Sequence, residues 1–594
     1  MEPTRGNSPL LESTPEASSG ARGLGPVVFV GALLAGYSLL IVGGLVSAFV
    51  SGHGWPSNHI PGVVALWTHA KVPSRAWHVA VGPVWLYWSI SALLVAVAIA
   101  GPWYVVSRVK NHSRERAADL DRLPGFANRR EVSAIAGKRQ LLARAKILRP
   151  SLANARLGDL GFFLGRSRRV GVHSSSENSL FCVAPPRLGK SRYVAINSCL
   201  QSPGCLLSTN TRPDALAVTY FDRAAKGPVM VFDPEGLARG VPRGSRWNVA
   251  QGCNDPRIAI RRALSLSNSA ADGIEGGAYW LGRCQAVIRC LLYAAALEGM
   301  GAADLYRWSV SPSAAGEAVT ILHASPMAQW ARDLDDVVTM EPRQRASIWG
   351  LVSNVFCALA DPDVIDQLTP DGDDFDPEVF LLEGNGTIYL LGTASGSTSN
   401  FVTALVDAVV DSARHLAAAM PSARLDPPLT IVLDEAANFA LANLDSLMSE
   451  GGGSGICTSV FVQSLAQMRD RWGYEKASAI WDAASVKLIL GGSSAKDLQD
   501  LSALIGDYVE IDTSTTDHEG GGRSSSRSVR RRPILELSTI REMKESWALM
   551  LIPRAKPIAL KMSPWDARRD AKKLRANKAR VEEMLRRGAE SRRS

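Results

Sequence analysis

A short stretch in the first third of the chain has residue types that bind phosphate. Residues 179–200 read SLFCVAPPRLGKSRYVAINSCL, and Gly189, Lys190 and Ser191 match the end of the P-loop pattern G-x-x-x-x-G-K-[ST]. In a P-loop the backbone N–H groups hold the phosphates, the lysine reaches the β- and γ-phosphates, and the hydroxyl ligates Mg²⁺. Ala184 stands where the pattern has its first glycine. The stretch is therefore either a phosphate-binding loop with one substitution or a basic turn that contains Gly-Lys-Ser by chance.

The first interpretation implies ATP and Mg²⁺ as cofactors and defines the residues that contact them. In this loop Pro185 and Pro186 would stiffen the turn in place of the missing glycine. The residues predicted to bind the nucleotide are Pro185, Pro186, Arg187, Leu188, Gly189, Lys190, Ser191 and Arg192.

A second motif supplies two adjacent carboxylates. In PPLTIVLDEAANFA, the apolar run at residues 430–433 predicts a buried strand that ends at Asp434 and Glu435. Ligands of open α/β sheets bind at the carboxyl ends of the strands, so both acids are expected beside the loop. We predict that Asp434 holds Mg²⁺ together with Ser191, and that Glu435 orients or deprotonates the attacking water. The alternative is a strand end followed by a capped helix.

A third candidate follows another strand. Residues 456–462 have the apolar character of a strand, and Gln463 comes directly after them. A glutamine there is placed to contact the γ-phosphate or the water, although a simple polar strand end is the alternative. The predicted catalytic residues are thus Lys190, Asp434, Glu435 and Gln463.

The elements that position these residues form an α/β pattern. After residue 150, short apolar runs alternate with longer helical segments, which predicts an α/β domain with a parallel sheet. Residues 179–184 are a predicted strand and 190–201 the helix that follows. Residues 256–380 are mostly helical and are predicted to be an inserted all-helical subdomain. We therefore place the ATPase domain in two parts, within 107–255 (with a linker) and over 381–565.

Composition narrows the class of partner. The 594 residues carry a net charge of +9, which favours an anionic partner such as nucleic acid, anionic lipid or phosphates. The eight cysteines form no C-x-x-C pair, which makes a zinc site unlikely, and small buried thiols in a reducing cytosol are expected.

The N-terminal part has a different character. Residues 1–23 have a composition typical of disorder, and we expect them to be cytoplasmic. Two apolar runs at 24–50 and 79–106 predict a pair of transmembrane helices joined by a short external loop. Basic residues flank the pair on the outer ends, so the positive-inside rule predicts a multi-pass membrane protein with both ends in the cytoplasm. Two buried helices of a soluble domain are the alternative.

Two segments near the C-terminus are rich in arginine. Residues 517–532 read DHEGGGRSSSRSVRRR, which predicts a mobile loop, either a solvated linker or a phosphate contact. Residues 566–594 predict a charged, basic helical tail that is solvated or touches nucleic acid, lipid or an accessory protein.

Further motifs, in a fixed order, carry a resemblance to a known family. Three motifs follow the P-loop: a strand with TRPD at 206–219, a strand with DPEG at 229–236, and RWNVAQGC at 246–253. Two more segments follow Gln463, at 485–509 and 531–543. Together with the nucleotide motifs, this series resembles the coupling proteins of type IV secretion and conjugation systems, which are TraG/TraD-like ATPases related to FtsK-type motors. The resemblance covers most of residues 100–565. The family's loop commonly reads G-P-x-x-x-G-K-[ST], so only Ala184 departs from it.

The resemblance implies a RecA/FtsK-like ATPase anchored in the inner membrane of a bacterium. It also implies a hexamer with ATP between subunits and an arginine supplied by the neighbouring subunit. It implies single-stranded DNA with its relaxase, and components of the secretion channel, as partners. An FtsK-like translocase of double-stranded DNA that acts without a relaxase remains an alternative, and a non-hydrolysing substrate receptor is another. Only Ala184 favours the receptor, and Asp233 is expected to be structural rather than catalytic.

Overall fold

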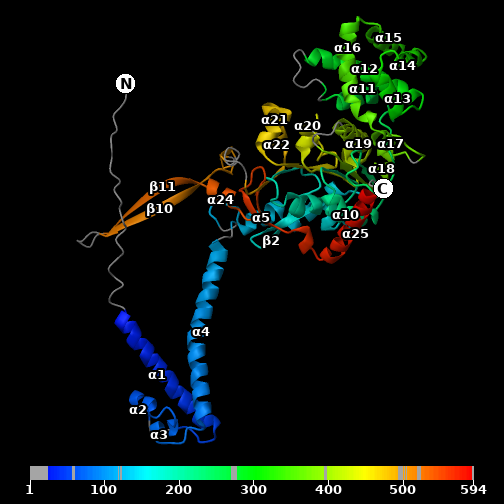
Figure 1. Ribbon diagram of the computed structural model, residues 1–594. Helices are drawn as coiled ribbons and strands as arrows, with labels where there is room; N and C mark the ends of the chain where they lie inside the picture. Colours follow the sequence, from blue (N-terminus) through cyan, green and yellow to red (C-terminus); the bar gives the residue numbers. More distant parts are fainter. Residues whose placement is uncertain are drawn as a thin grey trace, which may run out of the picture. The chain divides into compact units, whose positions relative to one another are not determined.

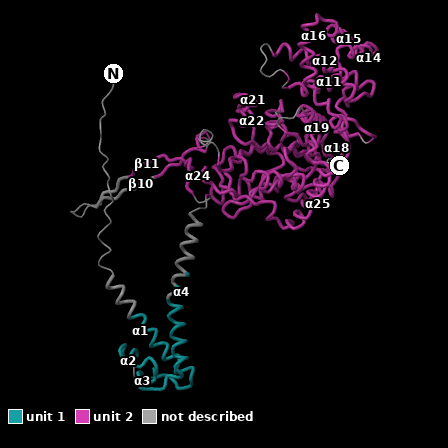
Figure 2. The backbone as a smooth tube through the Cα atoms, in the orientation of Figure 1, with its two compact units in different colours: residues 1–119 teal, residues 120–594 magenta. Residues whose placement is uncertain are grey.

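The computed structural model consists of two compact units, residues 1–119 and 120–594, which are described separately (Figure 2). The structure describes the backbone of residues 25–56, 60–117, 120, 123–268, 270, 277–372, 374–393, 398–439, 441–492, 499–500, 502–503, 505–517 and 523–591. The N-terminus predicted to be disordered lies outside these residues.

In its described part, the first unit is helical. Its helices are α1 (Gly25–Val50), α2 (Val63–Thr68), α3 (Pro73–Trp77) and α4 (Val84–Ala117). The side chains of Trp77 and Tyr87 are buried beside Ala48 of α1. The Ser47 hydroxyl donates to the main-chain oxygen of Val81 at 2.7 Å, which fastens α1 to the segment before α4.

The predicted membrane hairpin is contradicted by the structure. A bilayer core requires about 20 consecutive apolar residues in a helix. No helix in the described part of the chain is long and apolar enough to span a membrane. The predicted transmembrane pair within 24–106 and the predicted multi-pass location in an inner membrane are therefore wrong.

The second unit is built on an 11-stranded mixed sheet with strand order β2-β1-β13-β12-β9-β3-β8-β7-β4-β6-β5 (Figure 1). The strands are β1 (Gly161–Ser167), β2 (Val170–Ser175), β3 (Leu180–Val183), β4 (Leu206–Asn210), β5 (Val229–Phe232), β6 (Thr387–Leu391), β7 (Leu429–Leu433), β8 (Ile456–Val462), β9 (Val486–Leu490), β12 (Trp547–Leu551) and β13 (Ile558–Met562).

The seven strands from β9 to β5 are parallel, as the sequence predicts. They read as nearly continuous apolar runs because helices cover both faces of a parallel sheet. Strands β12, β13, β1 and β2 extend this sheet in antiparallel order, which the sequence analysis did not predict. The result is an α/β fold whose parallel centre contains both predicted nucleotide motifs.

The second unit also contains many helices, some beside the sheet and others, α11 to α16, in a separate group (Figure 1). In chain order they are α5 (Arg129–Ala136), α6 (Lys138–Ala143), α7 (Ala145–Leu148), α8 (Leu157–Leu160), α9 (Ile196–Gln201), α10 (Asp214–Ala224), α11 (Pro256–Leu266), α12 (Gly277–Leu297), α13 (Ala302–Val310), α14 (Gly316–His323), α15 (Ala328–Val338), α16 (Pro342–Val355), α17 (Pro362–Gln367), α18 (Pro377–Glu383), α19 (Ser399–Ala419), α20 (Leu444–Glu450), α21 (Leu465–Trp472), α22 (Tyr474–Ala483), α24 (Leu537–Arg541) and α25 (Ala571–Glu590).

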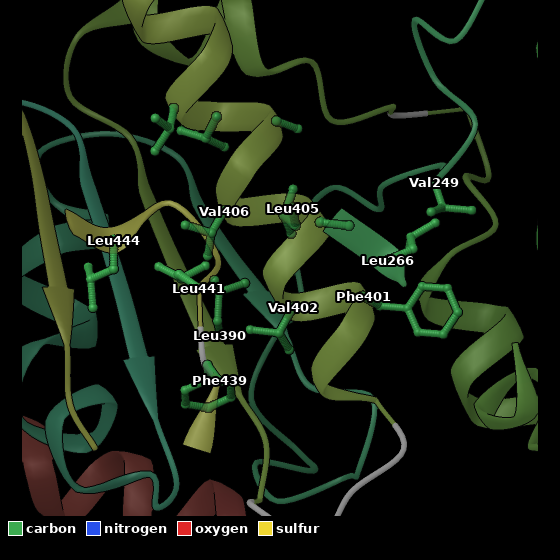
Figure 3. Packing of buried hydrophobic residues seen from close by; sticks show 14 of the residues in the cluster. Val249, Leu266, Leu390, Phe401, Val402, Leu405, Val406, Phe439, Leu441 and Leu444 are labelled. Carbon is green, nitrogen blue, oxygen red and sulfur yellow. The ribbon is translucent and has the colours of Figure 1, made fainter. Parts of the chain in front are cut away.

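Between β5 and β6, the described chain forms helices α11 to α18, so the predicted helical segment is helical throughout its described elements. Helix α19 connects these helices to the sheet through one continuous core. Figure 3 shows Phe401 of α19 on the side of Val249 and Leu266, whereas Val402 lies toward Leu390 of β6. This core positions the segment that follows the two predicted carboxylates.

The arginine-rich segment predicted to be a loop is partly a strand. Strand β10 (Asp507–Asp517) pairs antiparallel with β11 (Arg523–Pro533), and residues 518–522 lie outside the described residues. An ion pair of 2.6 Å joins Arg532 Nε to Glu510 Oε2. Backbone pairing holds this segment in a hairpin although its Gly, Ser and Arg composition is typical of a loop.

Candidate nucleotide-binding site

The order of the parallel strands brings the predicted motifs together. Strand β8 lies between β3 and β7, and β4 lies on the other side of β7. Because these strands are parallel, the residues that follow β3, β7, β8 and β4 meet at one edge of the sheet. These residues are the P-loop, the carboxylate pair, the glutamine and the TRPD segment, so the candidate site is assembled from four strand ends.

The loop after β3 has the backbone geometry of a tight turn into a helix. Arg187 and Gly189 have φ values of 66° and 79°, in the left-handed region. A Cβ on Gly189 would meet Tyr193 Cδ2 at 2.6 Å and Glu545 Oε1 at 2.8 Å, so only glycine fits at this position. Residues Ser191–Ala195 form a π-helical turn (η3) that leads into α9.

Ala184 fits the loop without backbone strain. It is fully buried, and its N–H donates to the main-chain oxygen of Val462 at 3.0 Å. It is not among the described residues with positive φ, so its position does not use the conformational freedom of glycine. The substitution at the start of the pattern is therefore compatible with a formed P-loop.

Lys190 and Ser191 face the two carboxylates. Lys190 Nζ lies 3.2 Å from Asp434 Oδ1 and 3.3 Å from Glu435 Oε1. The Ser191 hydroxyl donates to Asp434 Oδ2 at 3.0 Å. The ammonium thus contacts both carboxylates, and the hydroxyl contacts that of Asp434, which groups at one point the residue types that bind phosphate and a divalent cation.

The carboxylate of Glu435 is held by several donors. Its backbone is in the left-handed region (φ 53°, ψ 49°), a strained conformation for a residue other than glycine. Thr211 Oγ1 donates to Oε2 at 2.8 Å, and Asn438 Nδ2 donates to the same oxygen at 3.1 Å. Gln463 Nε2 donates to Oε1 at 3.3 Å. The strained backbone and these contacts fix the carboxylate at the edge of the sheet.

The environment of Glu435 keeps it ionised. Burial raises the pKa of this carboxyl, but the Lys190 ammonium and the hydrogen bonds from Thr211 and Gln463 outweigh burial. The net result is a pKa below the ordinary value of a glutamate. Glu435 is therefore available as a hydrogen-bond acceptor at neutral pH.

A cleft of about 960 Å³ opens above these residues. The predicted site residues that line it are Pro186, Arg187, Gly189, Lys190, Ser191, Arg192, Asp434, Glu435 and Gln463. Pro185 and Leu188 do not line the cleft, because their side chains lie toward Gly492 at the end of β9. The cleft has room for a nucleoside triphosphate beside the loop.

The oxygen atoms at this edge fit Mg²⁺. Asp434 Oδ1 is buried and has no hydrogen-bond donor, although Lys190 Nζ lies 3.2 Å away. The Ser191 hydroxyl lies beside the other oxygen of the same carboxylate. Mg²⁺ is usually held by one or two protein oxygens together with substrate phosphates and water, and this donor set meets that requirement.

Several residues in or beside the cleft were not assigned to it from the sequence. Thr211 and Asn438 contact Glu435 directly, and Arg212, Asp214 and Glu545 are among the lining residues. The TRPD segment follows the buried strand β4, so a polar run after a strand was an available signal for Thr211. No comparable signal marks Glu545, which is distant in sequence from both nucleotide motifs.

Asp233 lies outside the cleft-lining residues. Its two carboxylate oxygens accept from the backbone N–H groups of Leu237 and Ala238, each at 2.7 Å. Burial raises its pKa despite these two bonds. Asp233 thus closes the turn after β5.

Comparison with known proteins identifies similar domains and folds. Residues 428–545 match the protein family described as "TraM recognition site of TraD and TraG". The solved structure of the plasmid coupling protein TrwB with a non-hydrolysable ATP analogue is similar at a TM-score of 0.50 and 17% identity, over 72% of this chain and 92% of that one. For unbound TrwB the TM-score is 0.49 and the identity 16%, over 70% of this chain and 92% of that one. For VirB4 of Thermoanaerobacter pseudethanolicus the TM-score is 0.37 and the identity 12%, over 68% of this chain and 96% of that one. A search of curated proteins finds no match.

The mixed sheet and its nucleotide motifs define an α/β protein of the P-loop class, with the fold of the TrwB structure at TM-score 0.50. The matched family over residues 428–545 is that of TraD and TraG. Together these findings confirm the resemblance to TraG/TraD-like coupling proteins that the ordered sequence motifs indicate.

Proposed function

We propose that this chain is a coupling ATPase that recruits conjugative DNA or protein substrates and delivers them to a type IV secretion channel. The observation that carries the proposal is the convergence of Lys190, Ser191, Asp434 and Glu435 at one sheet edge. Lys190 lies 3.2 Å from Asp434 and 3.3 Å from Glu435, and Ser191 lies 3.0 Å from Asp434. This arrangement suits hydrolysis of a nucleoside triphosphate, because phosphoryl transfer depends mainly on positioning and electrostatic stabilisation.

Each residue has a defined role in the proposed reaction. Lys190 neutralises negative charge on the β- and γ-phosphates, and Asp434 with Ser191 would hold Mg²⁺, which when bound neutralises further charge on the phosphates. Glu435 accepts a hydrogen bond or proton from the attacking water, because its lowered pKa keeps it ionised.

Thr211, Asn438 and Gln463 act on the reaction through Glu435. Their hydrogen bonds fix its carboxylate relative to Lys190. A carboxylate held in this way loses little freedom when it contacts the water.

The proposed partners follow from the family resemblance and from charge. We propose single-stranded DNA with its relaxase as substrate, secretion-channel components as acceptor, and a homo-hexamer as the working form. The net charge of +9 supports an anionic substrate. The family description of residues 428–545 supports a protein partner on that part of the chain.

The test is ATP hydrolysis by the purified full chain, with and without single-stranded DNA. We expect DNA-stimulated turnover, with a loss of roughly 10²- to 10⁴-fold in Lys190→Ala and Glu435→Gln. Lys572→Ala, an exposed change outside the cleft, is the matched control. Stimulation by double-stranded DNA alone would favour the FtsK-like translocase. ATP binding without turnover under any condition would favour the substrate receptor.

A further inference from the structure

The cleft has a second wall, formed by the chain after the last strand. A 3₁₀ turn, η7 (Trp565–Ala567), follows β13 and leads to α25. Trp565, Asp566 and Lys578 line the same cleft as Lys190. The segment predicted to be a basic tail therefore contributes to the candidate nucleotide site, which its charge pattern did not predict.

Packing holds this segment against the ATPase core. Helix α25 lies against α10, and Leu574 is fully buried with Trp565 and Val218. Asn577 Nδ2 donates to Asp222 of α10 at 2.8 Å, and Lys573 Nζ donates to the same carboxylate at 2.6 Å. Residues 565–578 are thus held against α10 mainly by apolar packing.

An ion pair joins the wall to the P-loop helix. Arg192 donates to both carboxylate oxygens of Asp566, from Nη2 at 2.7 Å and from Nε at 3.3 Å. The hydrogen bond from Arg192 is the main reason that the pKa of Asp566 lies below its usual value. A carboxylate has about four lone-pair sites, so Asp566 keeps acceptor capacity after binding Arg192.

The two ends of the cleft have different chemistry. The loop end offers the ammonium of Lys190 and the hydroxyl of Ser191, which suit phosphates. The other wall offers the Asp566 carboxylate, next to Ile196, Val218 and Trp565, whose side chains are at most 9% exposed. A carboxylate repels phosphate but accepts hydrogen bonds from ribose hydroxyls and from amino groups of a base.

We infer that residues 565–578 form the nucleoside-binding wall of the site, with Asp566 as a residue that contacts the sugar or base of the bound nucleotide. The inference rests on the proposed nucleotide-binding function and goes beyond it. It assigns to the C-terminal segment a role in recognising the nucleoside, whereas the P-loop recognises the phosphates.

The test compares two probes that share phosphates but not a nucleoside. The affinities of the full chain for MgATP and for magnesium tripolyphosphate are measured by calorimetry in wild type and in Asp566→Ala. We expect the variant to bind MgATP roughly tenfold more weakly and to bind tripolyphosphate equally well or more tightly. Lys572→Ala, an exposed change in the adjoining helix α25 and outside the cleft, is expected to leave both affinities unchanged.

The outcomes separate this inference from the function it rests on. Equal losses for both probes in Asp566→Ala, or no loss for MgATP, would overturn the nucleoside wall and leave the nucleotide site intact. A wild-type chain that binds neither probe would overturn the proposed function as well. If the alanine variant unfolds at a lower temperature, the two affinities are measured instead in Asp566→Asn, which keeps the side-chain shape. Its affinity for MgATP is again expected to fall relative to its affinity for tripolyphosphate.

Discussion

The substitution Ala184→Gly restores the first glycine of the P-loop pattern, and the structure predicts that it brings no gain. Ala184 is fully buried and is not among the described residues with positive φ. Its methyl group contributes to packing under the loop, and its N–H is bound to Val462. A glycine there would remove packing without relieving any strain.

The expected cost follows from two contributions. Losing one buried methyl group removes about 0.8 kcal/mol of hydrophobic stabilisation. Glycine also gains freedom in the unfolded chain, which costs about 0.5 to 1 kcal/mol. Ala184→Gly is thus expected to destabilise the ATPase unit by about 1.5 kcal/mol, with no increase in nucleotide affinity or turnover.

The assay combines the midpoint of urea unfolding, followed by tryptophan fluorescence, with the affinity for MgATP. We expect a lower midpoint and an unchanged affinity. A variant that binds MgATP several-fold more tightly, or that hydrolyses it faster, would refute the reasoning, because it would mean that Ala184 distorts the loop.

Three further predictions follow from the same geometry. Gly189→Ala places a Cβ within 2.8 Å of other atoms at a φ of 79°, so it is expected to abolish MgATP binding in the same calorimetric assay. Thr211→Val removes one donor to Glu435 and is expected to lower turnover roughly tenfold, with the affinity for MgATP unchanged. Arg149→Ala leaves Asp426 unpaired in a site where both side chains are at most 9% exposed, and should cost about 3 to 5 kcal/mol of unfolding free energy. Burial raises the pKa of Asp426, but hydrogen bonds from the backbone and side chain of Ser151 and from Arg149 outweigh burial. The pKa of Asp426 therefore lies below the ordinary value of an aspartate. The stability difference between wild type and the arginine variant should therefore be full above about pH 4 and shrink as pH falls below it.

The parallel centre of the sheet could be predicted because its strands are short, apolar and buried. Residues 456–462 were predicted as a strand and form β8 with the same bounds, and the run before Asp434 forms β7. The grouping of the site residues could be inferred from these strands, because a parallel sheet places the carboxyl ends of its strands at a common edge. Gln463 follows β8 and donates to Glu435, whereas its predicted contact with the γ-phosphate or the water stays a prediction.

Features that depend on long-range packing were not predictable from local pattern. The antiparallel strands β12 and β13 pair with β9 and β1, and nothing in their sequence states this order. The hairpin β10–β11 has a loop-like composition, but its backbone hydrogen bonds form a ladder that does not depend on apolar side chains. The role of Asp566 depends on the path of α25 along α10, which the charge pattern of the tail does not reveal.

The membrane prediction rested on hydropathy alone, which counts apolar residues along a helix. In the part of the chain that the structure describes, no helix meets the length and apolar character of a membrane span.

The position of β3 in the sheet has a consequence for synthesis of the chain on the ribosome. This strand pairs only with β8 and β9, where Leu180 lies opposite Ser459 and Val486. All four residues of β3 are buried in the finished sheet, so the nascent chain carries an unpaired apolar strand until more than three quarters of its length has been made. Unpaired strands of this kind expose aggregation-prone edges, and pairing across such long sequence separations is slow. The P-loop thus emerges early but acquires its neighbours late, and we expect the nascent chain to depend on chaperones through most of translation.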